Sequence, residues 1–480
     1  MNLIMILVGL VLRLIGANQS FWLDEGASIE IALTPISGFV EKMATDFHPP
    51  LFYLLLKSWL PLAGNMEWLI RLPFILLGVA TLPAFFFLLK DIFGEHKRSV
   101  PFIGMALLAF SPFHIYYSQE LRMYSLNTLF TVLSWLCLLR FQRKANSKDL
   151  IIFTVLNTLN LYTFYGAFFN LAAQILYLLF AQKRIRALFF SILVSLLFFA
   201  PWLPVMLRQV EVGGYLKNAL PGWQVLSGSL TAKSLLLIPL KFFFGRISFA
   251  PKSLYFLLAG ITSALYLFPL VIVLIKKEKK SLPFFFWAII PLFIASIISL
   301  KTPVLGYWRF LFVLPPLLAL TSFGISNFSQ SGKNFFFGSL IFFSLLSTLI
   351  YWYSPTNQRE DWRGLSVYVD RPNSLTIVNF PFAFAPLRFY APNLNYTPAQ
   401  SSLGILRPDL IESVLSAPET SVFLLDYLSD LTDSQRKVKR DLEKAGFVLV
   451  SEKTFTNLGS IYEYRPPVKA DPSSIRRIIK

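Results

Sequence analysis

Residues 18–50 read N-Q-S-F-W-L-D-E-G-A-S-I-E-I-A-L-T-P-I-S-G-F-V-E-K-M-A-T-D-F-H-P-P, and the rest of the chain is organised around them. One short apolar segment precedes this stretch and a long series of apolar segments follows it. It places Asp24, Glu25, Asp46 and His48 close to a predicted membrane surface. Charged groups at the end of a membrane span cost free energy unless they find water, a partner or a function. The stretch therefore predicts chemistry at the membrane edge.

The composition predicts an integral membrane protein. Of 480 residues, 55% are hydrophobic and 15% are charged, with a mean hydropathy of +0.59, whereas soluble domains carry about 25% charged residues. Aromatic residues make up 16% of the chain, which suits lipid-facing and interfacial positions. The net charge of +18 comes largely from short loops between apolar runs and from the C-terminal tail. This distribution favours contact with membrane lipids and argues against nucleic acid as a partner.

Two features of the chain narrow the class further. The single cysteine, Cys137, lies in an apolar run, so neither an intramolecular disulfide nor a Cys-based metal site is expected. Residues 1–17 are apolar and short, but no basic residues precede them and Arg13 interrupts the run. We therefore expect a retained first membrane span and not a cleaved signal peptide.

Eleven segments are candidate membrane spans, because a span needs about 20 predominantly apolar residues. The candidates are 2–17, 68–90, 100–117, 123–140, 149–165, 167–182, 187–207, 253–275, 282–300, 306–327 and 335–353. The run 234–244 is too short to count and is expected to be re-entrant or interfacial.

Basic loops fall at every second connection between these segments and predict the orientation. They are 94–98, 140–148, 182–186, 276–280 and 331–333. By the positive-inside rule these loops are cytoplasmic. The alternate connections, which mix acidic, basic and aromatic groups, then lie outside. We expect a multi-pass plasma (inner) membrane protein whose chemistry takes place on the extracytoplasmic side.

The chain changes character after residue 353. Residues 374–380 and 421–427 read as buried strands, 433–446 as an amphipathic helix ending at Gly446, and 447–464 as a hairpin. We predict two domains. Residues 1–353 form an all-α membrane module with interfacial helices in its first outer loop, 18–67, and residues 354–480 form a small extracytoplasmic α/β domain.

Asp24 and Glu25 have two interpretations on the residues alone. They are a solvated pair capping a helix at a span end, or they are a catalytic pair in which one carboxylate accepts a proton and the other orients it or binds a cation. A general base needs to lie within hydrogen-bond reach of the proton that it removes.

Six motifs in order resemble a known enzyme family. They are W-L-D-E-G-A (22–27), D-F-H-P-P-L-F-Y (46–53), E-W-L-I-R-L-P (67–73), Y-Y-S-Q-E-L-R-M-Y-S-L (116–126), R-F-L-F-V-L-P-P (309–316) and E-D-W-R-G (360–364). The series resembles glycosyltransferase family 39, the dolichyl-phosphate-mannose protein mannosyltransferase-like group of the GT-C superfamily, which includes the lipid A aminoarabinose transferases. The resemblance covers residues 1–130 well and continues to about residue 365.

The resemblance implies an inverting transfer of a sugar from a polyprenyl-phosphate donor to an acceptor. It does not identify the acceptor. Asp24 matches the family's catalytic aspartate and Glu25 the second acid. Because negative charge develops on the leaving phosphate, cations are needed opposite the base. The candidates for phosphate binding are Arg13, Arg71, Arg122, Lys301 and Arg309. The candidates for the substrate cavity are Asp46, His48, Tyr117, Glu120, Tyr307 and Asp361. The resemblance does not establish a cofactor, and Asp46 and His48 are weak candidates for the ligands of a divalent metal.

Structural alternatives stay open for several of these residues. Arg13 is equally consistent with snorkelling, Arg309 and Asp361 with interfacial anchoring, and Arg122 with an ion pair to Glu120. The main rival function is a polyprenyl-lipid or glycan transporter or flippase. That rival predicts internal repeats and charges near the bilayer midplane, but we find no repeat, and the charges cluster toward one surface. A lipid-to-polymer ligase of the same superfamily is a second rival, against which the early D-E pair argues.

Overall fold

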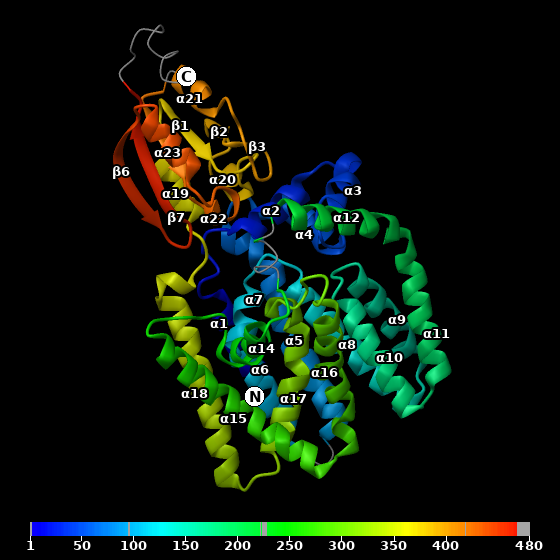
Figure 1. Ribbon diagram of the computed structural model, residues 1–480. Coiled ribbons are helices and arrows are strands. Elements are labelled where there is room, and N and C mark those ends of the chain that lie inside the picture. Colours follow the sequence, from blue (N-terminus) through cyan, green and yellow to red (C-terminus); the bar gives the residue numbers. More distant parts are fainter. Residues whose placement is uncertain (1, 95–96, 221, 223–227, 418, 468–480) are drawn as a thin grey trace. The chain divides into compact units, whose positions relative to one another are not determined.

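The computed structural model describes residues 2–94, 97–220, 222, 228–417 and 419–467 (Figure 1). The chain divides into two compact units. The first, here the helical unit, comprises Met1–Asn18, Ile31–Val212 and Val225–Asn357. The second, here the α/β unit, comprises Gln19–Glu30, Gly213–Gln224 and Gln358–Lys480. The division differs from a single boundary at 353/354, because two upstream segments pack with the C-terminal residues.

The helical unit is built from helices throughout its described residues. The helices that lie wholly within it are α1 (Asn2–Leu14), α3 (Ile36–Ala44), α4 (Leu51–Ala63), α5 (Glu67–Phe93), α6 (Ser99–Phe110), α7 (Pro112–Ser118), α8 (Tyr124–Lys144), α9 (Ser147–Leu161), α10 (Ala167–Ala181), α11 (Ile185–Phe199), α14 (Ala232–Phe244), α15 (Lys252–Lys276), α16 (Leu282–Ile298), α17 (Leu314–Ile325) and α18 (Gln330–Tyr353). Short 3₁₀ turns are η1 (Ala200–Trp202), η2 (Lys279–Ser281), η3 (Tyr307–Val313) and η4 (Pro355–Asn357). Two helices, α2 (Leu23–Leu33) and α12 (Leu203–Ala219), contain a boundary between the units.

Seven stretches in the described part of the chain are helical, long and apolar enough to cross a membrane, or eight if the bent pair α6 and α7 counts as one span. The prediction of eleven spans is not confirmed. All eleven predicted segments are largely helical, but α1 has only 13 residues and α9 and α10 have 15 each. At 1.5 Å per residue, a 15-residue helix is about 22 Å long, which falls short of a hydrocarbon core of about 30 Å.

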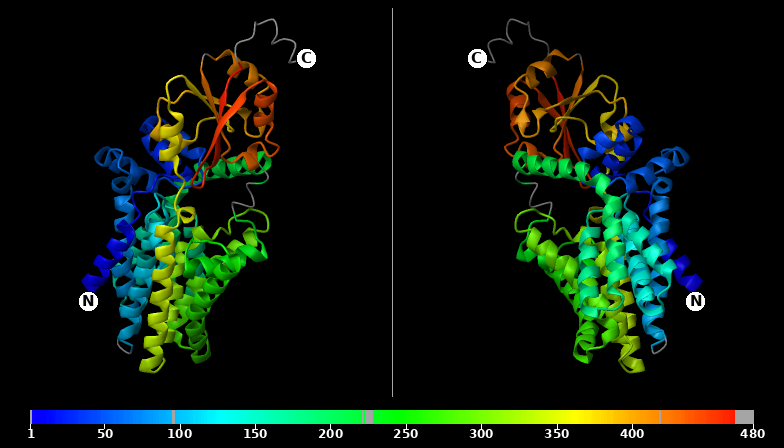
Figure 2. Two further views of the ribbon diagram at one scale, coloured as in Figure 1. Left: turned by 90° about the vertical axis from the view of Figure 1, so that its left-hand side faces the viewer. Right: turned by 90° about the vertical axis from the view of Figure 1, so that its right-hand side faces the viewer.

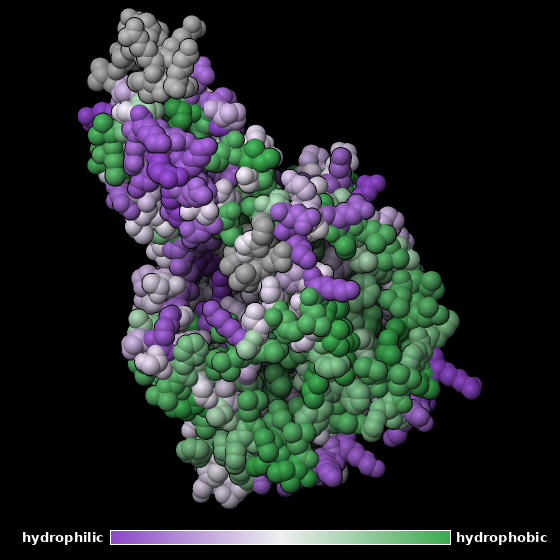
Figure 3. Space-filling view, viewed as in Figure 1, coloured by the Kyte–Doolittle hydropathy of each residue, from purple (hydrophilic) through white to green (hydrophobic). Residues whose placement is uncertain are grey.

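Large apolar side chains lie on the outside of this unit. On α11, Phe190, Leu197 and Phe198 are each more than 60% exposed. Figure 3 shows hydrophobic residues over the outer surface of these helices. Monomeric soluble proteins rarely expose so much contiguous apolar surface, so this surface faces lipid and the chain is an integral membrane protein.

Polar side chains hold α8, α9 and α10 together from inside. Asn127 donates to Asn160 Oδ1 at 2.8 Å, and Asn160 in turn donates to Thr131 Oγ1 at 3.0 Å. Gln174 of α10 donates to Ser134 Oγ of α8 at 2.9 Å. Hydrogen bonds across helices stabilise membrane bundles, because hydrocarbon offers no other partner for these groups.

The α/β unit is centred on a five-stranded sheet of order β2-β1-β5-β7-β6. Its strands are β1 (Ser374–Val378), β2 (Tyr396–Pro398), β5 (Ser421–Leu425), β6 (Val448–Phe455) and β7 (Gly459–Arg465). β1 pairs in parallel with β2 and β5, whereas β7 pairs antiparallel with β5 and β6. Strands β3 (Gln400–Ser402) and β4 (Ile405–Leu406) form a separate small ladder. The predicted strands, the C-terminal hairpin and an α/β fold are confirmed.

Helices cover both faces of this sheet, as Figure 2 shows. Because side chains alternate along a strand, Phe423 and Leu425 of β5 join one core, and Val422 and Leu424 join the other. The first core includes side chains of α19 (Trp362–Val369) and α20 (Ala385–Tyr390). The second includes side chains of α21 (Leu410–Ser416) and α23 (Lys437–Lys444). A short helix, α22 (Ser429–Thr432), follows β5. The predicted helix 433–446 corresponds to α23, with Gly446 just past its end at a φ of 86°.

Candidate functional site

The predicted site residues divide between the two units. Asp24, Glu25 and Asp361 lie in the α/β unit, and the other candidates lie in the helical unit. Each group is therefore described within its own unit.

The start of α2 is fixed to the α/β unit by side chains. Side chains accept from three consecutive backbone N–H groups at its start: those of Phe21 and Trp22, which precede the helix, and that of Leu23, its first residue, which has no partner within the helix. The pairs are Phe21 N–H to Tyr390 Oη at 2.9 Å, Trp22 N–H to Glu25 Oε2 at 3.3 Å and Leu23 N–H to Glu360 Oε2 at 2.9 Å. Two of these three acceptors come from residues more than 330 positions later in the chain.

Close packing fixes the body of α2 as well. A Cβ atom at Gly26 would lie 2.6 Å from the backbone nitrogen of Pro386, in the first turn of α20. A residue with a side chain at this position would clash, so the glycine of the W-L-D-E-G-A motif allows α2 to approach α20. Glu30, one turn further along α2, forms an ion pair with Arg388 of α20. These contacts make α2 part of the α/β unit up to Glu30.

Glu25 has a structural role in this arrangement. Its side chain is fully buried, and its Oε1 lies 3.9 Å from Nη1 of Arg359. Its other oxygen accepts from the Trp22 N–H, as the glutamate of a capping box does. A carboxylate engaged on both oxygens is poorly placed to bind a substrate, so the prediction of Glu25 as a second catalytic acid is not supported.

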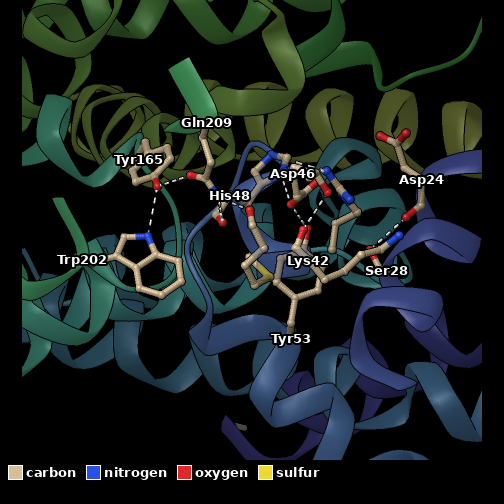
Figure 4. A network of polar contacts seen from close by, with 12 residues as sticks. Asp24, Ser28, Lys42, Asp46, His48, Tyr53, Tyr165, Trp202 and Gln209 are labelled. Atoms are coloured by element: carbon tan, nitrogen blue, oxygen red, sulfur yellow. Dashed lines mark hydrogen bonds and ion pairs between the residues drawn. The ribbon is translucent and has the colours of Figure 1, made fainter. Parts of the chain in front are cut away.

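Asp24 differs from its neighbour, because its side chain is only partly buried. Its backbone carbonyl accepts from Ser28 Oγ at 2.8 Å, one turn along α2, and its carboxylate points away from that bond (Figure 4). The helix backbone around Asp24 is thus fixed, while Asp24 itself is not fully buried. A general base has to reach the proton that it removes, and incomplete burial of Asp24 is compatible with that role.

A second acid lies directly beneath the start of α2. Glu360 accepts from three donors: Leu23 N–H at 2.9 Å, the Trp362 indole at 2.7 Å and the Tyr427 hydroxyl at 2.8 Å. Burial raises the pKa of Glu360, the three hydrogen bonds lower it, and the charge of Asp24 raises it, with a net increase. Sequence analysis quoted Glu360 within E-D-W-R-G but assigned it no role.

The predicted pair Asp46 and His48 lies in the turn between α3 and α4 of the helical unit. Asp46 Oδ2 accepts from the Tyr53 hydroxyl at 2.7 Å and lies 3.3 Å from His48 Nδ1. Arg122 Nη2 lies 3.4 Å from both ring nitrogens of His48. Burial by itself raises the pKa of Asp46, but the hydrogen bonds from His48 and Tyr53 and the charges of His48 and Arg122 lower it to about 2. Asp46 is therefore a fixed anion that orients His48.

Residues from α12 and from the segments after α9 and α11 hold this turn in place (Figure 4). Gln209 donates to the backbone carbonyls of Met43, in the last turn of α3, at 2.6 Å and of His48 at 3.1 Å. Tyr165 donates to Gln209 and accepts from the Trp202 indole. Since one amide binds a carbonyl on α3 and the carbonyl of His48, α12 helps to fix the position of His48.

A metal site at Asp46 and His48 would need further ligands. In the described part of the chain, no group of three or more His, Cys, Asp or Glu side chains comes together. Two ligands do not make a site that selects a metal.

Two of the predicted phosphate ligands are engaged inside the helical unit. Arg13 is fully buried, and its guanidinium makes five polar contacts. The partners are the carbonyls of Gly9, Leu108 and Ala109 at 2.8 to 3.2 Å, His114 Nδ1 at 2.8 Å and Ser118 Oγ at 3.3 Å. Arg71 is also fully buried and donates to the Ala17 carbonyl at 2.7 Å. These contacts give Arg13 a structural role inside the bundle in place of the expected snorkelling, and Arg71 fixes the backbone that follows α1.

The remaining cations have more accessible side chains. Lys301 is exposed just after α16, and Arg309 is partly exposed in η3. Arg309 donates to the Pro303 carbonyl at 3.1 Å and lies over the Trp308 ring. Sequence analysis missed Arg246, which follows α14, donates to the Tyr116 hydroxyl and lies over that ring. Its only sequence signal was a lone basic residue after a short apolar run.

Ring contacts connect the aromatic candidates with His48 in the helical unit. Tyr307 contacts Phe113, which contacts Tyr117. Tyr117 contacts Tyr124, and Phe164 contacts both Tyr124 and His48. The predicted cavity residues Tyr307, Tyr117 and His48 therefore belong to one continuous aromatic cluster.

Glu120 and Asp361 occupy local structural positions. Glu120 is buried in the turn between α7 and α8, where its backbone carbonyl accepts from the backbone N–H of Arg122 at 2.7 Å. Asp361 is the N-cap of α19, and its Oδ1 accepts from the Gly364 N–H at 2.9 Å. An N-cap contact of this kind stabilises a helix by about 1 kcal/mol, which accounts for Asp361 without a catalytic role.

Comparisons with known proteins agree with this architecture. Residues 47–207 match the family of dolichyl-phosphate-mannose-protein mannosyltransferases. A search of curated protein sequences finds no match. The structure of ArnT from Cupriavidus metallidurans bound to undecaprenyl phosphate aligns with a TM-score of 0.63 and 13% identity over 96% of this chain and 97% of that one. Its apo form aligns with a TM-score of 0.61 at 12% identity, with the same coverage of both chains.

A third match comes from an archaeon. The oligosaccharyltransferase AglB from Archaeoglobus fulgidus, in complex with an inhibitory peptide and a dolichol-phosphate, aligns with a TM-score of 0.52 and 10% identity over 97% of this chain and 74% of that one. At such identities these matches establish the fold. The chain thus has the fold of ArnT and AglB, and the match over residues 47–207 confirms both the resemblance to a protein mannosyltransferase family and the enzyme class, a membrane glycosyltransferase.

Proposed function

We propose that the chain transfers a sugar from a polyprenyl-phosphate donor to an acceptor on the extracytoplasmic side of a plasma (inner) membrane, with inversion at the anomeric carbon and Asp24 as the general base. The observation that carries the proposal is the start of α2. Its backbone is anchored by Tyr390, Glu25 and Glu360, while the carboxylate of Asp24 stays partly exposed.

The polyprenyl-phosphate donor is supported by the structural relatives. ArnT was solved with undecaprenyl phosphate and AglB with a dolichol-phosphate. The basic loops at alternate connections support the proposed orientation. A donor held by its lipid phosphate fits a protein whose outer surface is apolar and whose accessible cations, such as Arg309 and Lys301, lie at the ends of apolar helices.

The chemistry assigns one role to each kind of group. An acceptor hydroxyl or amine attacks the anomeric carbon, and Asp24 takes its proton. The bond from the anomeric carbon to the phosphate oxygen breaks, and the lipid phosphate leaves with both electrons. Cations stabilise the charge that develops there. We assign this role to Arg122, Arg246, Lys301 and Arg309, and no longer to Arg13 or Arg71. Tyr117, Tyr307 and His48 line the proposed substrate region.

The test uses the full-length protein in nanodiscs with a panel of polyprenyl-phosphate sugars, and measures release of free polyprenyl phosphate. Mass spectrometry of outer-surface glycans and glycolipids, with and without the gene, supplies the donor sugar and the acceptor. Asp24→Asn is expected to lower turnover by at least about 10³-fold, the magnitude typical of losing a general base. Glu41→Gln, which alters an exposed acid on α3, is the matched control.

Two results would refute the proposal. One is full donor cleavage by Asp24→Asn. The other is movement of the intact lipid-linked sugar across the bilayer with no cleavage by the wild-type chain, which would support the transporter or flippase alternative instead.

A further inference from the structure

We propose that Glu360 is a positioning residue for the transfer reaction, fixing the turn of α2 that carries Asp24. The inference rests on the proposed role of Asp24 as the base. Glu360 itself touches no reacting atom in this scheme.

Glu360 connects three elements of the α/β unit at one carboxyl group. Its Oε2 accepts from Leu23 N–H of α2 at 2.9 Å and from the Trp362 indole of α19 at 2.7 Å, and its Oε1 accepts from the Tyr427 hydroxyl after β5 at 2.8 Å. Trp362 and Tyr427 are buried members of the first core. The bond to Leu23 therefore ties the residue before Asp24 to the rigid centre of the unit.

The contact with Leu23 is made through the backbone, which determines what Glu360 can control. A bond to the N–H at the first helical position fixes the direction in which α2 begins. Asp24 is the next residue, so its Cα follows that direction. An error of 1 Å in the position of a reacting group can lower turnover by about 10²-fold.

A purely structural anchor would not need the charge. A glutamine at position 360 can place its oxygen where Oε2 now accepts from Leu23 and Trp362. Its amide N–H can then donate to the Tyr427 oxygen, because a hydroxyl is both donor and acceptor. Glu360→Gln thus removes the charge and keeps all three contacts, whereas Glu360→Ala removes both.

The experiment measures kcat and KM for donor cleavage in the full-length protein. Glu360→Ala is expected to lower kcat by about 10–100-fold with a KM for the donor within about threefold of wild type, because the base is displaced but the donor site is intact. Glu360→Gln is expected to keep kcat within about threefold of wild type, because it keeps all three contacts.

The matched control is Glu463→Ala. Glu463 lies on β7 of the same unit and accepts from the Tyr368 hydroxyl at 3.1 Å and from Ser451 at 3.0 Å. This variant is expected to keep kcat within about threefold of wild type. Unfolding temperatures of all variants are recorded alongside, so that activity is compared among folded proteins.

The outcomes separate this inference from the proposed function. An equal loss of kcat in Glu360→Ala and Glu463→Ala, or no recovery of kcat in folded Glu360→Gln, overturns the role of Glu360, while Asp24 stands if Asp24→Asn is inactive. Wild-type turnover in Asp24→Asn overturns the proposed base itself. A lower unfolding temperature with unchanged kcat in Glu360→Ala would show that Glu360 is only structural, and this too overturns the inference.

Discussion

Gly26→Ala is the sharpest perturbation of the proposed site, because it adds one methyl group where α2 meets α20. The new Cβ would lie 2.6 Å from the nitrogen and Cγ of Pro386 and 2.7 Å from its Cδ. Non-bonded carbon atoms normally stay about 3.5–4.0 Å apart. The proline ring is rigid and its nitrogen belongs to the backbone, so α2 must move away by about 1 Å.

The expected effects on stability and on turnover differ in size. Overpacking costs about 1–3 kcal/mol, and the better helix propensity of Ala returns about 0.5–1 kcal/mol. We therefore expect a folded protein destabilised by about 1–2 kcal/mol. Asp24 lies two residues away on the same turn, so a 1 Å shift is expected to lower kcat by about 10²-fold.

The assay is donor cleavage in nanodiscs at saturating donor, together with the thermal unfolding midpoint. Gly38→Ala is the control, because a Cβ there would meet only Thr34 Cγ2, at 3.8 Å. That variant adds the same methyl group to a helix without crowding, so its kcat should match wild type and its midpoint should stay or rise. Wild-type kcat in Gly26→Ala would refute the claim that α20 positions the turn carrying Asp24.

Three further predictions concern stability. The low pKa of Asp46 means that its ionised form stabilises the folded state by about 2 kcal/mol, and this stabilisation is lost as pH falls from about 4 toward 2. The difference in unfolding midpoint between wild type and Asp46→Asn should therefore shrink as pH falls below 4. Arg13→Met should lower the unfolding midpoint markedly, because it removes the hydrogen bonds that Arg13 donates to buried carbonyls. The KM for the donor should stay within about twofold of wild type. A large rise in KM in the folded variant would show that Arg13 binds the donor phosphate. Asn160→Leu should destabilise the helical unit by about 0.6–2 kcal/mol, because it breaks the hydrogen bonds to Asn127 and Thr131. Asn157→Leu should be neutral or stabilising, since both polar atoms of that buried side chain have no partner among the described residues. A larger loss of stability for Asn157→Leu than for Asn160→Leu in chemical denaturation would contradict this prediction.

Local sequence patterns predicted the fold class and most elements. Hydropathy located every long apolar helix, because lipid demands a continuous apolar stretch whatever its neighbours are. Short apolar runs, helical periodicity and turn residues located β1, β5, α23 and the C-terminal hairpin, because these signals act within a few residues of the chain. The count of spans failed where helix length decided it: α9 and α10 are apolar enough to suggest spans but have only 15 residues each.

The amino-acid sequence by itself determined that this is a membrane protein with acids and cations gathered toward one side, and it singled out Asp24. Only the tertiary structure showed that Asp24 and Glu25 differ in role. Glu25 is buried against Arg359, 334 positions away, and the start of α2 depends on Glu360 and Tyr390, which are equally remote. Arg13 likewise became a structural residue only once α6 and α7 surrounded it. Contacts between distant segments depend on how helices and sheet pack, and no pattern within a short window encodes them.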